Sequence, residues 1–91
     1  MTMSHVSVQM TYRDGRPFAA YIGLGRALGE SSVRSEELSP EIVVDFSEDG
    51  RPLGIEVIDP SSATAEDIYG VFDVLGLRRP SPDALAPLVA A

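Results

Sequence analysis

The tetrapeptide Asp-Gly-Arg-Pro occurs twice, at residues 14–17 and 49–52, and each copy interrupts a run of alternating apolar and polar residues. Such alternation is typical of a half-buried β-strand, and Asp-Gly is a strong signal for a tight hairpin turn. The sequence therefore predicts two β-hairpins as the framework of the fold.

In each hairpin the alternation predicts which side chains share a face of the sheet. For the first hairpin, the apolar sets are Val6, Val8, Met10 and Tyr12 before the turn, and Phe18, Ala20, Ile22 and Leu24 after it. For the second, a loop of two or four residues would pair Phe46 with Leu53, Val44 with Ile55, and Ile42 with Val57, all on one face. A three-residue loop, unless bulged, would mix the two faces, so an even loop is predicted. Residues 33–38 form a further short polar strand.

The periodicity changes after the second hairpin. Ile68, Val71, Phe72 and Leu75 follow helical spacing, Thr64 and Asp67 resemble a capping box, and Gly76 suits a helix end. The expected fold is α+β: a small antiparallel sheet of about four to five strands, with one C-terminal amphipathic helix packed on a face. Residues 1–77 would form this single domain, and residues 78–91 a loosely packed Pro/Ala-rich tail.

Composition narrows the classes of partner. The chain has 91 residues and a formal net charge of -7, with 14 acidic residues against 7 Lys and Arg. This balance repels phosphate backbones, so nucleic acid is not expected as a partner. We expect no membrane span, because no run of about 18 apolar residues occurs, and the absence of a signal-like start indicates a cytoplasmic protein. With no cysteines, disulfides and thiolate metal sites are excluded.

One segment resembles an EF-hand calcium loop, with oxygen donors and a glycine at the required spacing: Asp45, Ser47, Asp49, Gly50 and Glu56. An EF-hand requires a helix on each side, whereas the upstream residues 41–46 are rich in β-branched residues that favour a strand. We therefore interpret the segment as a hairpin turn. No cofactor and no metal are expected, and Asp45, Asp49 and Glu56 remain the only weak metal candidates.

Other chemistry is weakly indicated. Asp45 and Glu56 fall on one face of the hairpin, and paired carboxylates can perform acid/base catalysis or bind a divalent ion. His5, the only histidine, lies near the start of the chain and is a poor candidate for a catalytic triad. Gly23, Gly25 and Gly29 are interpreted as a loop, because no strand–helix–strand unit follows. No catalytic or cofactor-binding residue is predicted.

The order of motifs resembles a bacterial family known as domain of unknown function 2283. The resemblance rests on "TY" followed by an acidic turn, on "AAYIGL", and on "VDFSEDGRPLGIEVID" at residues 44–59, and it covers about residues 8–59. It implies a small antiparallel sheet with a helix, and it supports the hairpin over calcium binding. No catalytic residue is established for the family. Its members often lie beside genes that resemble small toxins, which suggests an antitoxin-like, partner-neutralising role.

The face opposite Val44 carries unusual apolar area for a solvated sheet face, and its candidate interaction residues are Ala19, Tyr21, Val43 and Ile58. The predicted function is therefore a small non-enzymatic protein-interaction module. A homodimer is the favoured cover for this face, and the other options are a different protein, which could be basic, or the chain's own Leu85 and Leu88. The alternative functions are an enzyme that binds a small ligand or divalent metal through Asp45 and Glu56, or a purely structural homo-oligomer.

Overall fold

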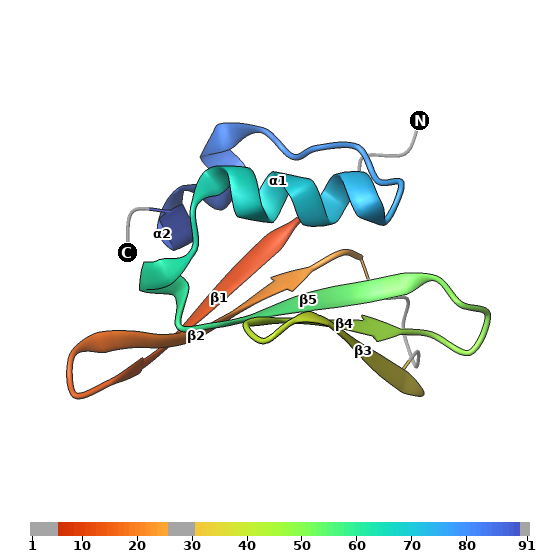
Figure 1. The fold of residues 1–91 in the computed structure, drawn as a ribbon, viewed down its shortest axis with the longest axis horizontal. Helices are drawn as coiled ribbons and strands as arrows, with labels where there is room; N and C mark the ends of the chain where they lie inside the picture. Colours follow the sequence, from red (N-terminus) through yellow and green to blue (C-terminus); the bar gives the residue numbers. More distant parts are fainter. Residues whose placement is uncertain (1–5, 26–30, 90–91) are drawn as a thin grey trace.

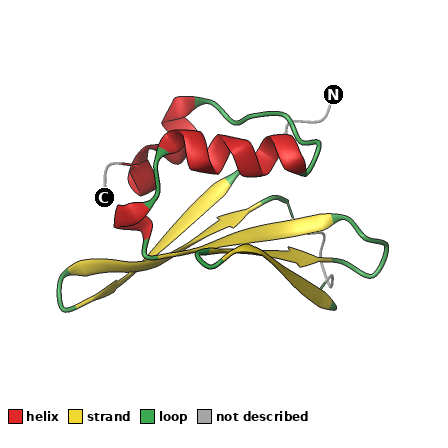
Figure 2. Ribbon diagram, in the orientation of Figure 1, coloured by secondary structure: helices red, strands yellow, loops and turns green. Residues whose placement is uncertain are grey.

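The computed structural model describes residues 6–25 and 31–89, and it shows a five-stranded antiparallel sheet with the helical segments on one side (Figures 1 and 2). The elements are β1 (Ser7–Arg13), β2 (Arg16–Gly23), β3 (Arg34–Ser39), β4 (Ile42–Phe46), β5 (Pro52–Ile58), the 3-10 helix η1 (Pro60–Ser62), α1 (Ala65–Val74), the 3-10 helix η2 (Pro82–Leu85) and α2 (Ala86–Val89). The strand order is β1-β2-β5-β4-β3, so the two predicted hairpins form and lie side by side.

The core lies between the sheet and the helices. Every strand except β3 contributes inward apolar side chains to it: Val8 and Met10 from β1, Ala20 and Ile22 from β2, Ile42, Val44 and Phe46 from β4, and Ile55 and Val57 from β5. Helix α1 adds Ile68, Val71 and Phe72. The antiparallel sheet and the amphipathic stripe of α1 were therefore predicted correctly, whereas the predicted alternation fails near the first turn, where Tyr12 and Phe18 are exposed.

The ends of α1 follow from local sequence. The Thr64 side chain accepts a hydrogen bond from the Asp67 amide, and the Asp67 carboxylate accepts one from the Thr64 amide, which completes the predicted capping box. At the other end Gly76 has a φ of 71°, and the Leu77 amide donates to the Phe72 carbonyl at 2.9 Å. This is the geometry of a Schellman C-cap, which requires a left-handed residue after the helix.

The segment after α1 is not loosely packed, and that expectation was wrong. Leu85 and Leu88 are buried in the same core as the sheet residues, and α2 contacts β1. Arg79 anchors the path to these residues through two hydrogen bonds to Asp73, at 3.0 and 2.6 Å. The leucines therefore cover the helix side of the sheet and leave the opposite face uncovered by this segment (Figure 1).

The sheet contains three hairpins: the two predicted ones, β1–β2 and β4–β5, and a third formed by β3 and β4. Each contains a β-bulge, with one additional residue on one strand. The additional residues are Phe18 in β2, Leu38 in β3 and Leu53 in β5. A bulge disrupts the alternation locally and changes the direction of a side chain. Consequently Phe18 does not join Ala20 and Ile22 in the core as predicted, and 44% of its surface is exposed.

The loop of the second hairpin also differs from the prediction. The pairs of Ile42 with Val57 and of Val44 with Ile55 are confirmed, whereas Phe46 pairs with Pro52 instead of Leu53. The Ser47 amide donates to the Arg51 carbonyl at 2.9 Å, so these residues flank a loop of odd length. The prediction of an even loop was wrong because the bulge at Leu53 restores the register that an odd loop would otherwise shift.

Candidate functional site

The sheet face turned away from α1, called the open face here, is organised in rows that cross the strands. One row is formed by Gln9, Tyr21, Glu56, Val43 and Glu37, and a second by Ser7, Gly23, Gly54, Asp45 and Ser35. Thr11, Ala19 and Ile58 form a third. Side chains that are neighbours in such rows contact one another across the strands. The register therefore places all four predicted interaction residues on this one face.

Tyr21 leans from its own row into the neighbouring one. Its hydroxyl donates a hydrogen bond to Asp45 Oδ2 at 3.3 Å, and the Ser35 hydroxyl donates to Asp45 Oδ1 at 2.7 Å. The tyrosine ring lies over Gly54, where a Cβ atom would come within 1.9 Å of the hydroxyl oxygen. Glycine is therefore required beneath this ring, and Asp45 holds its outer end.

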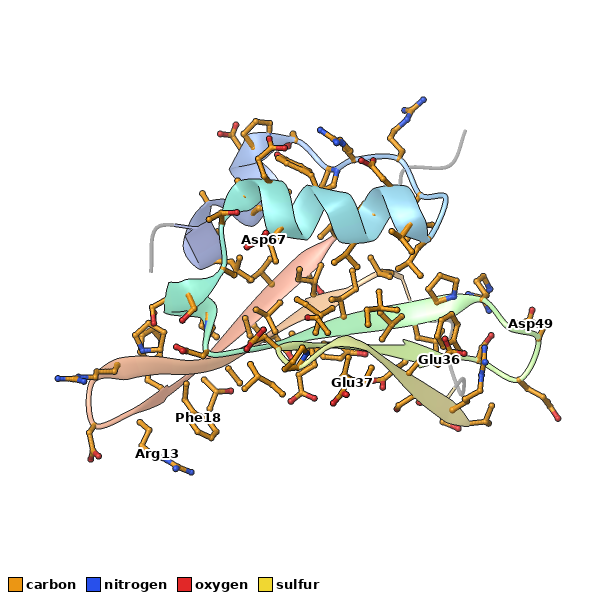
Figure 3. The ribbon with its side chains drawn as sticks, viewed as in Figure 1. Arg13, Phe18, Glu36, Glu37, Asp49 and Asp67 are labelled. Carbon is orange, nitrogen blue, oxygen red and sulfur yellow. The ribbon has the colours of Figure 1, made fainter. Side chains whose placement is uncertain are left out.

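Apolar side chains gather beside this tyrosine. Ala19 and Ile58 are direct cross-strand neighbours, and 42% of the surface of Ile58 is exposed. The bulge adds Phe18 to the same side of the sheet, where Figure 3 shows it pointing away from α1. We define the open-face patch as Phe18, Ala19, Tyr21, Val43 and Ile58.

Charge is distributed unevenly along this face. At the hairpin end the Arg13 guanidinium stacks on the Phe18 ring, 4.0 Å from its centroid (Figure 3). Three acids lie toward the other end of the face: Glu56 lies between Tyr21 and Val43 in their row, Glu37 lies beside Val43, and Asp45 lies in the next row. The row of Ala19 and Ile58 thus lies between a basic end and an acidic one.

The residues of the EF-hand pattern are dispersed by the fold. Asp45 and Glu56 do share the open face, as predicted, but Asp49 lies at the tip of the hairpin (Figure 3). Its carboxylate accepts a hydrogen bond from the Ser47 hydroxyl, and Gly50 has a φ of 85°. Within the described part of the chain, no three His, Asp or Glu side chains are grouped to hold a metal ion. Ser47, Asp49 and Gly50 of this pattern therefore form the hairpin turn.

Asp49 and Asp59 are two of the three aspartates whose pKa values are lowered in the described part of the chain. The hydrogen bond from Ser47 lowers the pKa of Asp49 against the opposing effect of desolvation, and the Arg51 amide and charge lower it further. Hydrogen bonds from the Ser62 and Ser61 hydroxyls lower the pKa of Asp59 in the same way. Both carboxylates are therefore held in the charged form, which suits turn-stabilising residues better than a general acid.

Other predicted positions contribute little to this face. His5 and Gly29 lie outside the described residues. Phe18 was missed as a surface residue because strand alternation was extended through Pro17, although a proline within a strand is a recognised sign of a bulge or an edge. The equivalent proline, Pro52, precedes the second bulge in the same way.

The comparisons with known proteins place this surface within a family. Residues 19–61 match the family model described as "Protein of unknown function (DUF2283)". The chain matches no curated protein and no solved structure. The matched segment contains the whole open-face patch except Phe18. None of the helices described is long and apolar enough to cross a membrane.

Proposed function

The chain belongs to the DUF2283 family of proteins of unknown function, and we propose that it is a non-enzymatic protein-interaction module that assembles as a homodimer through its open face. The observation that carries this proposal is the open-face patch. It joins side chains of β2, β4 and β5, and the helices of the described chain lie on the opposite side of the sheet. Exposed apolar side chains gathered on one face, here with Glu56 among them, are typical of a protein interface.

The charge distribution supports a second copy as the occupant. A two-fold axis through the row of Ala19 and Ile58 would place the Arg13 end of one copy over the acidic end of the other. In a two-fold interface each contact occurs twice, so both basic ends would meet an acidic end. The row of Ala19 and Ile58 would lie at the centre of the interface, with Arg13 and the acids on either side of it.

The competing enzyme hypothesis is less well supported by the geometry. Both oxygens of Asp45 already accept hydrogen bonds, from Tyr21 and from Ser35. This carboxylate therefore positions a tyrosine over Gly54, and proton transfer by Asp45 would compete with these two hydrogen bonds. A structural role for Asp45 accounts for its contacts without invoking a substrate.

The mass of the protein in solution tests the homodimer. Ile58→Lys inserts a charge into the proposed interface at a side chain that is already partly exposed, so we expect a folded monomer. Val74→Lys is the matched control, because Val74 is 73% exposed and lies on the helix side. Light scattering should give twice the monomer mass for the wild type and the control. A wild-type monomer at high micromolar concentration would refute the proposal.

A charge exchange tests the orientation of the two copies. Arg13→Glu alone should weaken the dimer because it places acid over acid, and adding Glu56→Arg should restore it. Tyr21 is a poor probe of this interface, because its ring is already engaged with Gly54 and Asp45. If the double variant stays as weak as Arg13→Glu, the two-fold arrangement is wrong even where a dimer exists.

The antitoxin-like, partner-neutralising role suggested by the family resemblance is a narrower form of the same proposal. It requires a second surface that remains available when the open face is occupied by another copy. Such a role would be supported by a defined binding partner, and the acidic character of the chain favours a basic one.

A further inference from the structure

A groove of about 650 Å³ lies on the helix side of the sheet, between α1 and the β3–β4 hairpin. Its apolar lining comes from both walls: Leu38 and Ile42 from the hairpin, Ala63 before the helix, and Val71 and Val74 from α1. Leu38 points here because it is the additional residue of the β3 bulge. Leu38 and Val74 are among the most exposed large apolar side chains of the described residues.

Four carboxylates surround this apolar lining: Glu41, Asp59, Glu66 and Asp67. No Lys, Arg or His lines the groove among the residues that the structure describes. Asp59 stays ionised because serine hydroxyls lower its pKa, and Asp67 accepts a hydrogen bond at the start of α1. The groove is therefore an apolar channel with an acidic border on both walls.

We propose that this groove binds an amphipathic helix of a partner protein, with an apolar stripe flanked by Lys and Arg. The groove runs beside α1, whose 10 residues span about 15 Å. Helices that pack on one face of a sheet form a layer, with axes about 8–10 Å apart. The groove lies where a second helix of this layer would pack beside α1. Helix-in-groove binding uses anchors at i, i+3, i+4 and i+7, which fits an elongated apolar lining.

The acidic border identifies the chemistry of the occupant. A second copy of this chain carries a net charge of -7 and would bring acid against acid, whereas a basic helix is attracted from a distance and held at the rim. The groove lies on the opposite side of the sheet from the open-face patch. This inference therefore does not depend on the homodimer, and both surfaces can be occupied together.

The experiment uses the full chain and synthetic helical peptides. The probe is a fluorescein-labelled peptide of about 18 residues, five helical turns, with leucines at i, i+3, i+4 and i+7 spacing and lysines elsewhere. Two peptides serve as controls: one has glutamate in place of lysine, and one has the same composition in an order that destroys the apolar stripe. Fluorescence anisotropy should show saturable binding of the probe alone, weakening as salt is raised.

Variants of the protein locate the binding. Glu66→Lys should weaken binding about threefold, as expected for a rim charge, whereas Glu48→Lys makes the same charge change at the distant hairpin tip and should have no effect. Val74→Lys should weaken binding about tenfold or more, because it places a charge in the apolar lining. Circular dichroism should confirm that each variant is folded, as their exposed positions lead us to expect.

Several outcomes would overturn the inference. Equal binding of the scrambled peptide would mean unspecific charge attraction, and equal losses for Glu66→Lys and Glu48→Lys would place the contact elsewhere. A halved mass for Val74→Lys, with Ile58→Lys unchanged, would mean that a second copy occupies the groove. Failure of the peptide to bind a protein that is dimeric would refute the groove alone, and a monomer that binds the peptide would refute the homodimer alone.

Discussion

The two hairpins share Asp-Gly-Arg-Pro but turn differently. In the first, Arg13 pairs with Arg16, and both loop residues are left-handed, Asp14 with a φ of 53° and Gly15 with a φ of 78°. This is the geometry of a two-residue turn. In the second, Ser47 and Arg51 flank a longer loop in which glycine supplies the left-handed residue. Identical turn residues therefore fix the place of the turn, while the preceding residues fix its length.

After the turn, each hairpin has the same strand pairing and a bulge at the same place, but the bulged residues differ in burial. The proline pairs with an aromatic residue in each hairpin, Pro17 with Tyr12 and Pro52 with Phe46, and the next residue is the bulged one. Yet Phe18 is 44% exposed and Leu53 is 1% exposed. The bulge is a property of the local sequence, whereas burial depends on where each hairpin lies in the sheet: the first hairpin includes the edge strand β1, and the second consists of the internal strands β4 and β5.

The largest expected effect comes from truncating the two bulged residues. Leu53→Ala should lower the free energy of unfolding by about 2–5 kcal/mol, because it removes a fully buried side chain and leaves a cavity. Phe18→Ala should change it by less than about 1 kcal/mol and should weaken association instead. Urea unfolding at low protein concentration separates the two effects. Similar losses of stability for both variants would mean that the bulges are equivalent.

A smaller effect is expected at the residue after each bulge, which is Ala19 in the first hairpin and Gly54 in the second. Gly54→Ala should destabilise by about 1–3 kcal/mol, because its Cβ would overlap the Tyr21 ring. Ala19→Gly should lose about 0.5–1 kcal/mol from backbone entropy alone.

The double variant Gly54→Ala with Tyr21→Ala identifies the cause. If the clash is responsible, the second substitution should offset much of the first, and the two effects should be strongly non-additive in thermal or urea unfolding. Additive losses would show that Gly54 is needed for its backbone and not for the ring above it.

These comparisons also explain what the sequence could predict. The strands, the helix and both of its caps depend on nearby residues, so patterns such as Thr64-to-Asp67 spacing and Gly76 were sufficient. The placement of Ala19, Tyr21, Val43 and Ile58 on one face also followed from alternation. The odd loop and the exposed Phe18 were missed, because each bulge shifts the period by one residue and leaves only a proline as its sign.

The groove and the tail could not be predicted for a different reason. Leu85 and Leu88 are three residues apart in a short segment rich in Pro and Ala, which is too short for a periodic pattern to indicate that they are buried. The groove joins Leu38 to Val74, which are far apart in the chain. An exposed apolar residue is common on protein surfaces, so neither Leu38 nor Val74 indicates a groove until tertiary packing places them on facing walls.

The smallest expected effect concerns the turn of the second hairpin, where Ser47 has no serine counterpart in the first. The Ser47 hydroxyl holds the pKa of Asp49 below its ordinary value of 3.8. A carboxyl whose pKa is lowered by folding contributes stability above its unfolded pKa, and that contribution is lost as pH falls through the folded pKa. The second turn should therefore weaken only below about pH 4. An NMR titration should find the Asp49 midpoint below 3.8 in the wild type, and Ser47→Ala should raise it toward that value. An unchanged midpoint in Ser47→Ala would assign the pKa shift to the Arg51 amide and charge instead. The two hairpin turns would then differ in length, and Ser47 would not be a further difference between them.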